Sequence, residues 1–251
     1  MLLVADVHGA VEALARVAGV GEPLLVLGDL INYIDYRSNE GIVAEVGGEA
    51  FTKQVVDART AGDFAEAGRL WRDFSAGRED ELRADFDQKV HDAYHDICAA
   101  LQGADAYVTF GNVDRPRMLA DHLPDGVRFV EAGVFDIEGH RVGFAGGGVM
   151  TINTPGEVTD ERMKANLASL GPVDILCTHV APAIGPLSQD VIGGRRKGSR
   201  PLLDYLREAQ PPFHYFGDIH QPQAVSWRIG STVSRNVGYF RATGRAVRHP
   251  G

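Results

Sequence analysis

Five short apolar runs in the chain each end on a polar side chain. The runs occupy residues 2–5, 24–28, 106–111, 174–178 and 213–217, and they are rich in Leu, Val, Ile and Phe. Apolar runs of this length, bounded by Gly or Asp, are typical of buried strands. The chain is therefore expected to contain at least five buried strands.

Other segments have apolar residues at helical spacing. A helix at about 10–18 lies between the first two runs, and this strand–helix–strand order predicts a parallel crossover and an α/β fold. Between Asp29 and Asn112, helical spacing covers 64–74 and 82–101, with a bend at 75–80. This pattern predicts a helical insertion at about residues 50–103.

After Asn112 the pattern becomes strand-rich. The expected strands are 127–130, 134–137, 142–145, 224–229, 232–237 and 239–247, and the expected helices are about 163–170 and 202–209. The composition does not shift sharply anywhere and no repeat is present. Residues 1–251 are therefore expected to form one domain.

Composition and charge narrow the class of protein. The chain is 44% hydrophobic and 24% charged, as in ordinary globular proteins, and no apolar stretch approaches the ~20 residues of a membrane span. No secretory signal is evident, and two cysteines do not suggest a disulfide framework, so a cytoplasmic protein without membrane contact is expected. The net charge of −9 argues against nonspecific nucleic-acid binding.

The polar residues that follow the five apolar runs are of the types that bind metal ions. They are Asp6, His8, Asp29, Asn112, His179, Asp218 and His220. Because ligands of α/β sheets gather beyond the carboxyl ends of strands, these residues are expected to share one site. Structural alternatives exist for each: Gly28-Asp29 is a common turn pair, Asn112 could cap a helix, and His179 could be a core residue. Their recurrence at five strand ends favours a metal site.

These motifs resemble those of the calcineurin-like metallophosphoesterases. The family's ordered blocks are D-x-H, G-D, G-N-x-[DE], a strand-end His and G-H-x-H. The matching residues are Asp6-Val7-His8, Gly28-Asp29, Gly111-Asn112-Val113-Asp114, His179 and Gly217-Asp218-Ile219-His220. The resemblance spans residue 2 to about 240, apart from the helical insertion. It implies an α/β fold that is a four-layer αββα sandwich of two mixed β-sheets.

The resemblance also implies a dinuclear metal centre. The first ion would have Asp6, His8, Asp29 and His220 as ligands. The second would have Asp29, Asn112, His179 and Asp218. A hydroxide bridging the two ions would attack phosphorus in a small phosphodiester or phosphomonoester, with Asp29, Asn112 and Asp114 as the catalytic residues. The expected cofactors are two divalent ions, Mn²⁺ first, with Fe, Zn²⁺, Ni²⁺ or Mg²⁺ as alternatives.

Two positions depart from the family's pattern. Asp218 stands where the family usually has His, so it either favours Mn²⁺ or Mg²⁺ at the second site or turns away and leaves that site weak. Val113 stands where many members have a His that protonates the leaving group, and Asn32 where those members pair that His with Asp. The alternative to an enzyme is a metal-binding protein with an impaired second site that acts through protein interactions.

The candidate substrate contacts are basic. Arg195, Arg196, Lys197 and Arg200 form a Gly-interrupted run before a helix that Ser199 is placed to cap. A phosphate-binding loop and a solvated surface loop are both consistent with this run. Arg115, beside Asp114, is a further candidate. Copies of the chain are also expected to be able to associate through the helical insertion.

Overall fold

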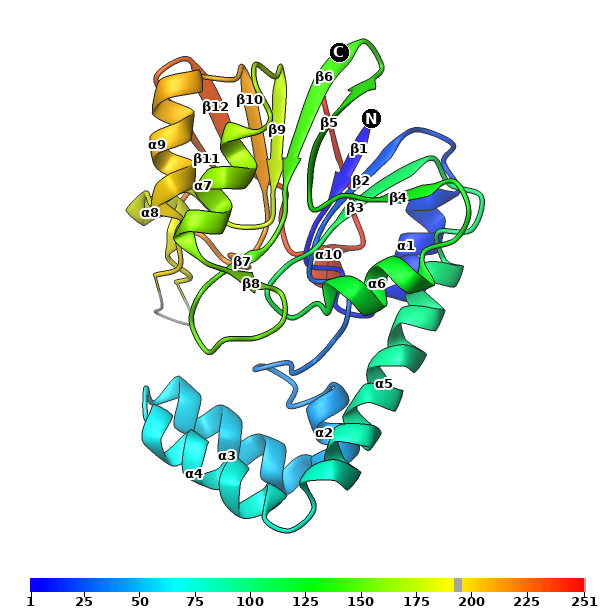
Figure 1. Ribbon diagram of the computed structural model, residues 1–251, viewed down its shortest axis with the longest axis vertical. Coiled ribbons are helices and arrows are strands. Elements are labelled where there is room, and N and C mark those ends of the chain that lie inside the picture. Colours follow the sequence, from blue (N-terminus) through cyan, green and yellow to red (C-terminus); the bar gives the residue numbers. More distant parts are fainter. Residues whose placement is uncertain (192–195, 251) are drawn as a thin grey trace.

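The computed structural model of the protein describes residues 1–191 and 196–250 and contains two large mixed sheets (Figure 1). The first sheet has the order β13-β1-β2-β3-β4. Its strands are β1 (Leu2–Val4), β2 (Leu24–Leu27), β3 (Ala106–Thr109), β4 (Val127–Phe129) and β13 (Val247–Arg248). Strands β1 to β4 are parallel, and β13 pairs with β1 in the antiparallel sense.

The second sheet has the order β11-β12-β10-β9-β6-β5. Its strands are β5 (Ala132–Ile137), β6 (His140–Ala145), β9 (Ile175–Thr178), β10 (Phe213–Phe216), β11 (Ser226–Ile229) and β12 (Thr232–Asn236). The four inner strands are parallel and the two edge strands antiparallel. A small third sheet joins β7 (Gly148–Val149) to β8 (Glu157–Val158).

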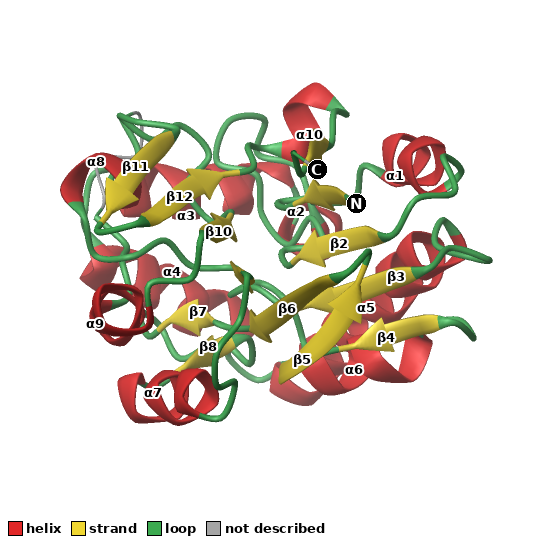
Figure 2. Cartoon of the chain, turned by 90° about the horizontal axis from the view of Figure 1, so that it is seen from above, coloured by secondary structure: helices red, strands yellow, loops and turns green. Residues whose placement is uncertain are grey.

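The alternation of side chains along the strands produces the layers. Leu3 and Leu25 of the first sheet belong to one apolar cluster with Phe144 and Cys177 of the second, so the two sheets pack face to face. The opposite face of the first sheet packs against α1 (Val11–Ala18), α5 (Glu79–Ala99) and α6 (Pro116–His122). The opposite face of the second packs against α7 (Asp160–Ala168) and α9 (Arg200–Ala209) (Figures 1 and 2). This order of layers is consistent with the expected sandwich.

A helical segment projects from the body beyond the ends of the sheets (Figure 1). It consists of α2 (Ile42–Gly47), α3 (Glu49–Thr60), α4 (Phe64–Ser75) and the first half of α5, and we call residues 42–90 the arm. Stacked and edge-on rings of Phe51, Trp71, Phe74 and Phe86 join its helices. The expected helices at 64–74 and 82–101 are confirmed, whereas α2 and α3 were not predicted and the helical region begins at 42 rather than 50.

The expected strand at 239–247 is wrong. Residues Phe240–Thr243 form the short helix α10, and only Val247–Arg248 enter a sheet. The backbone N–H groups of Phe240 and Arg241 donate to the carbonyls of Ala5 and Asp6, both at 3.1 Å, and these contacts hold the start of α10 against the end of β1. Gly244 then ends the helix in the left-handed conformation.

The remaining helix, α8 (Gly185–Ser188), is a single turn. Both cysteines are free and buried. Among the described residues, no helix has the length and apolar character that a membrane crossing requires.

Candidate metal centre

The motifs predicted from the sequence meet where strands of the two sheets end. Asp6 and His8 follow β1, Asp29 follows β2, His179 follows β9, and His220 follows β10. Two groups of potential metal ligands result, each with its ligand atoms within 4.8 Å of one another: Asp6, His8 and His220, and Asp6, Asp29 and His179. Segments more than 200 residues apart in the chain therefore form one candidate metal site.

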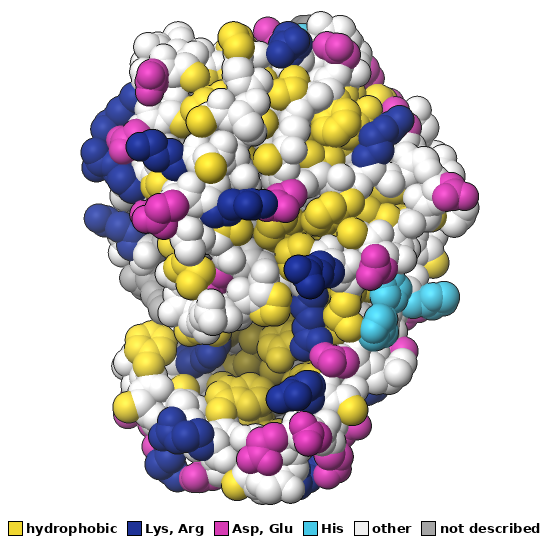
Figure 3. Space-filling model, in the orientation of Figure 1, with side chains coloured by type: hydrophobic (Ala, Val, Ile, Leu, Met, Phe, Trp, Pro, Cys, Tyr) yellow, Lys and Arg dark blue, Asp and Glu magenta, His cyan; other side chains and the backbone are white. Residues whose placement is uncertain are grey.

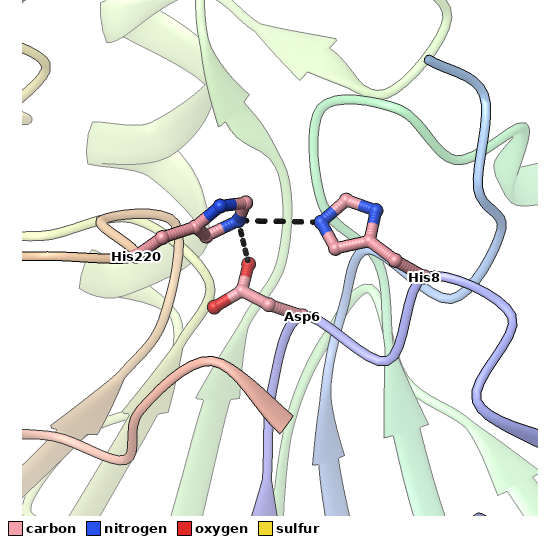
Figure 4. A group of neighbouring side chains, drawn as sticks. All are labelled: Asp6, His8 and His220. Carbon is pink, nitrogen blue, oxygen red and sulfur yellow. Dashed lines mark hydrogen bonds and ion pairs between the residues drawn. The ribbon is translucent and has the colours of Figure 1, made fainter. Parts of the chain in front are cut away.

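The first group places two imidazoles and a carboxylate around one point (Figure 4). The Nε2 atoms of His8 and His220 are 3.3 Å apart, and the Nε2 of His220 is 3.6 Å from Oδ1 of Asp6. The Nε2 of His8 is also 3.7 Å from Oδ2 of Asp29. Two ring nitrogens that face each other at this distance need a proton or a cation between them.

The second group lies on the other side of Asp29. The Nε2 of His179 is 3.5 Å from Oδ1 of Asp29 and 3.9 Å from Oδ1 of Asp218. Asn112 follows Gly111, which packs so closely on this group that an added Cβ would lie 2.1 Å from Oδ1 of Asp29. The site therefore requires glycine at position 111, and Asn112 follows directly in the chain after the end of β3.

Backbone carbonyls orient the two buried histidines. Nδ1–H of His8 donates to the carbonyl of Ile31 at 3.2 Å, and Nδ1–H of His179 donates to the carbonyl of Leu27 at 2.8 Å. A carbonyl only accepts, so in each ring the remaining nitrogen, Nε2, faces the carboxylates. Metal-binding histidines are commonly oriented by such a bond from the second nitrogen.

The backbone at the site is strained. Eight non-glycine residues in the described part of the chain have positive φ, and four of them are candidate ligands. These four are Asp6 (57°), His8 (42°), Asp29 (52°) and Asp218 (63°). Left-handed backbone is unfavourable for most residues other than glycine and clusters at functional sites. The fold thus holds the candidate ligands in conformations that they would not adopt on their own.

The carboxylates of the site attract positive charge. Burial alone lowers the pKa of His179, but Asp29, Asp218 and Asp6 outweigh it and raise that pKa to about 9. Burial likewise lowers the pKa of His220, and its contact with Asp6 raises the pKa by more. Oδ2 of Asp6 and Nε2 of His179 are buried without a hydrogen-bond partner among the described residues. A divalent cation would satisfy both atoms, so the donor set fits a metal ion.

Asp114 lies behind the candidate ligands. Its buried carboxylate accepts the backbone N–H groups of Asp29 (2.8 Å), Leu30 (3.0 Å) and Gly111 (2.9 Å) and the hydroxyl of Tyr94 (3.2 Å). Burial and the nearby charge of Asp29 raise its pKa to about 7. These contacts fasten the segment after β2 to the segment after β3, so Asp114 positions the ligands.

The structure places the candidate substrate-binding residues at different distances from the site. Lys197 reaches the site, where its Nζ lies 3.1 Å from Oδ1 of Asp218. Arg115 pairs with Asp87, and the exposed Arg200 pairs with Asp204 at 3.0 Å on α9. The exposed side chain of Arg196 packs beside Gly185, and Arg195 lies outside the described residues.

Tyr239 is a site residue that the sequence did not reveal. Its ring stacks on that of His220, with centroids 4.0 Å apart and planes inclined by 6°. The Arg37 guanidinium lies 5.3 Å from the same Tyr239 ring. Tyr239 was missed because the alternating pattern of the tail predicted a strand, in which no particular aromatic residue stands out.

Comparison with known proteins shows the fold alone. No family model and no curated protein sequence matches the chain. TT1561 of Thermus thermophilus, a crystal structure, is 11% identical, with a TM-score of 0.53 over 98% of this chain and 96% of that one. Another crystal structure is 15% identical, with a TM-score of 0.57 over 95% and 90% of the two chains. The architecture is thus shared with these proteins over nearly their whole length.

Proposed function

We propose that the protein is a metal-dependent phosphohydrolase of the calcineurin-like metallophosphoesterase type, with that family's αββα fold. The observation that carries the proposal is the convergence of D-x-H, G-D, G-N-x-D, His and G-D-x-H motifs at adjacent strand ends. Two imidazoles oriented by backbone carbonyls accompany them. So does one buried carboxylate oxygen, Oδ2 of Asp6, that has no hydrogen-bond partner among the described residues. The substrate class proposed is a small phosphodiester or phosphomonoester.

The candidate ligands form two sets, one on each side of Asp29. Asp6, His8 and His220 would hold one ion, and Asp29 would contribute an oxygen on either side, since its Oδ2 faces His8 and its Oδ1 faces His179. Asn112 and His179 would serve the opposite side. When bound, divalent ions at such a site supply Lewis acidity and an activated water for attack on phosphorus.

The chain offers no proton donor where many family members have one. The backbone N–H of Val113 donates to Oδ1 of Asp29 at 3.0 Å, and its side chain packs against the apolar core. General acid catalysis contributes typically 10²–10⁴-fold, and its absence slows the departure of poor leaving groups most. We therefore expect aryl esters, whose leaving groups need no proton, to be better substrates than alkyl esters.

The arm provides room for the part of the substrate beyond the phosphate. Figure 3 shows a hollow between body and arm with apolar side chains on its floor and Lys and Arg side chains at its edges. A cavity of about 230 Å³ lies between the segment after β2 and the arm helices, and it is lined by Tyr33, Ile34, Val43, Val55, Arg59 and Trp71. Tyr33 and Ile34 follow shortly after Ile31, whose carbonyl holds His8. An apolar cavity with one cationic residue suits a small apolar or aromatic leaving group.

A second candidate function rests on Asp218 and Val113. Asp218 is paired with Lys197, and no acid stands at position 113, so the alternative is a metal-binding protein whose arm contacts another protein. This alternative predicts metal binding without turnover. The phosphohydrolase predicts both.

The decisive experiment is turnover of an aryl phosphodiester and an aryl phosphomonoester by metal-free protein supplied with Mn²⁺, Mg²⁺, Zn²⁺ or Ni²⁺. Asp29→Asn keeps the size of a residue that faces both ligand groups. It should lower kcat/KM by more than about 100-fold, because the loss of a residue that only orients a metal ligand already lowers activity by about 10–100-fold. Asp57→Asn, at an exposed carboxylate in the arm, is the matched control and should retain activity. Stoichiometric metal binding without turnover under any of these metals would contradict the proposal.

A further inference from the structure

Lys197 is the one basic side chain from the predicted run that enters the candidate metal centre in the described part of the chain. Its Nζ lies 3.1 Å from Oδ1 of Asp218, whose side chain is 2% exposed. Oδ1 of Asp218 is in turn 3.9 Å from Nε2 of His179. The ammonium group therefore binds the carboxylate that replaces the expected histidine.

The backbone around Lys197 holds it in this place. The N–H of Lys197 donates to the carbonyl of Ser188 at 2.7 Å, and the N–H of Ser199 donates to the carbonyl of Ala181 at 2.9 Å. Between them, Gly198 packs so tightly that an added Cβ would lie 2.7 Å from Cα of Ala183. The segment is thus fixed against residues that follow His179, and its lysine is aimed at Asp218 by the fold.

The charges of the centre balance with one divalent ion. Asp6, Asp29 and Asp218 are buried and together carry three negative charges when ionised. Lysine is ordinarily an ammonium at neutral pH, and the Nζ of Lys197 lies 3.1 Å from the Asp218 carboxylate. One divalent ion and this ammonium contribute three positive charges. A second divalent ion would meet the ammonium at close range, where like charges repel strongly.

We propose that the ammonium group of Lys197 takes the place of the second metal ion by forming an ion pair with Asp218. This inference rests on the proposed function and specifies its metal centre: one divalent ion is held tightly by the group that includes Asp6, His8 and His220. Lys197 supplies the second positive charge beside Asp29. The bond to Asp218 uses one of the three N–H donors of the ammonium, and the other two have no partner among the described residues and can donate to the phosphate oxygens of a substrate.

The test counts metal ions and needs no turnover. Metal-free protein is equilibrated with increasing Mn²⁺ by dialysis, and bound Mn²⁺ per chain is measured by elemental analysis. Wild type should saturate at one tightly bound ion. Lys197→Met should bind a second ion at least about tenfold more tightly than wild type, because Asp218 is released and a like charge is removed. Lys197→Gln is a second uncharged variant, and Lys197→Arg should behave as wild type.

Two controls make the result specific. Lys53→Met breaks an exposed ion pair with Asp57 (2.6 Å) in the arm and should leave both affinities unchanged. The second control is the affinity for the first ion, which shows that the centre is folded. It should be unchanged in every lysine variant. Two ions bound equally tightly by wild type would overturn the inference. So would a second-ion affinity that is the same in wild type, Lys197→Met and Lys197→Gln. Absence of hydrolysis with the expected metal counts would instead overturn the proposed function and leave the lysine assignment standing.

Discussion

At the scale of single residues, the centre is built before any ion arrives. Asp6, His8, Asp29 and Asp218 have left-handed backbone, and His8 and His179 have their tautomers set by carbonyls. Each of these features costs conformational freedom or energy that the rest of the fold must offset. An ion entering the centre thus meets ligands that are already aimed at it and needs little rearrangement of the chain.

Metal binding should release protons, because the metal-free site holds them on imidazole. Nearby carboxylates outweigh burial and raise the pKa of His179 to about 9, so this ring is protonated at pH 7.5. An ion bound to Asp6, which belongs to both ligand groups, should offset those carboxylates, lower that pKa and drive the proton off. The apparent affinity for Mn²⁺ should therefore rise with pH, up to about tenfold per unit for each proton released, and level off above about pH 9. Titration calorimetry in two buffers of different ionisation enthalpy at pH 7.5 counts the protons directly.

The His179→Gln variant tests the origin of that proton. It should release fewer protons per ion bound than wild type and show a flatter dependence of affinity on pH. An affinity that does not change between pH 6.5 and 9.5 in wild type would contradict the assignment of a protonated His179.

At the scale of elements, β10 carries a buried histidine that the metal centre does not use. His214 contacts the hydroxyls of Thr178 (2.9 Å) on β9 and Ser234 (2.8 Å) on β12, so it links three adjacent strands. Burial lowers its pKa to about 3. The ring is therefore neutral in the folded protein over the whole range in which an unfolded chain would take up a proton.

This histidine should make the folded state sensitive to acid. Since the unfolded state binds the proton more readily, the contribution of His214 to stability is complete above pH 6.5. It declines as the pH falls from 6.5 towards 3, by up to about 1.4 kcal/mol per pH unit. Urea unfolding of metal-free wild type and His214→Gln between pH 7 and pH 4 measures the difference. The variant should lose less stability over this range, and His91→Gln, at an exposed ring, should follow wild type. Parallel curves for all three proteins would show that His214 does not titrate as stated.

The elements differ in how far the sequence predicts them. The strands that carry the candidate ligands are continuous apolar runs that end on Asp, Asn or His. A buried parallel strand can be recognised from such a run alone, because both of its faces are apolar. Helix α3 was missed because its apolar face is short and is completed only by rings of α4 and α5, as in the contact of Phe51 with Phe74. Lys197 is brought to Asp218 because the segment after β9 pairs with later residues, for example Pro182 with Ser199. The spacing of residues along the sequence does not predict such long-range pairing.

At the scale of the whole molecule, the apolar cluster of the first sheet continues into the arm, where Phe51, Trp71 and Phe74 pack against it. The arm helices are joined by the rings of Phe51, Trp71, Phe74 and Phe86, whereas the ligands are fixed by the strand ends of the body. Trp71 also lines the cavity formed by the arm helices and the segment after β2. Loosening the arm should therefore affect substrate binding without affecting the metal.

Trp71→Ala should loosen the arm selectively. Removal of a packed tryptophan costs about 3 kcal/mol or more, so amide hydrogen exchange in α3 and α4 should accelerate while bound Mn²⁺ per chain stays unchanged. Hydrogen-exchange mass spectrometry resolves the two regions. Trp227→Ala, at a tryptophan that is 44% exposed in the body, is the control and should leave exchange in the arm as it is. Equal acceleration in the arm and the two sheets of Trp71→Ala would show that arm and body unfold as one unit.

The position of the arm within the chain has a consequence for how such proteins diversify. The arm lies entirely in the connection between β2 and β3, which are adjacent parallel strands paired from Leu24 with Ala106 to Leu27 with Thr109. The body already resumes in the second half of α5, where the Tyr94 hydroxyl reaches Asp114. A lineage can thus lengthen, shorten or exchange residues 42–90 while the strand ends keep their register. The arm is therefore a segment that can be replaced while the body keeps its strand ends in place, and new binding properties can arise by recombination at a single site in the gene.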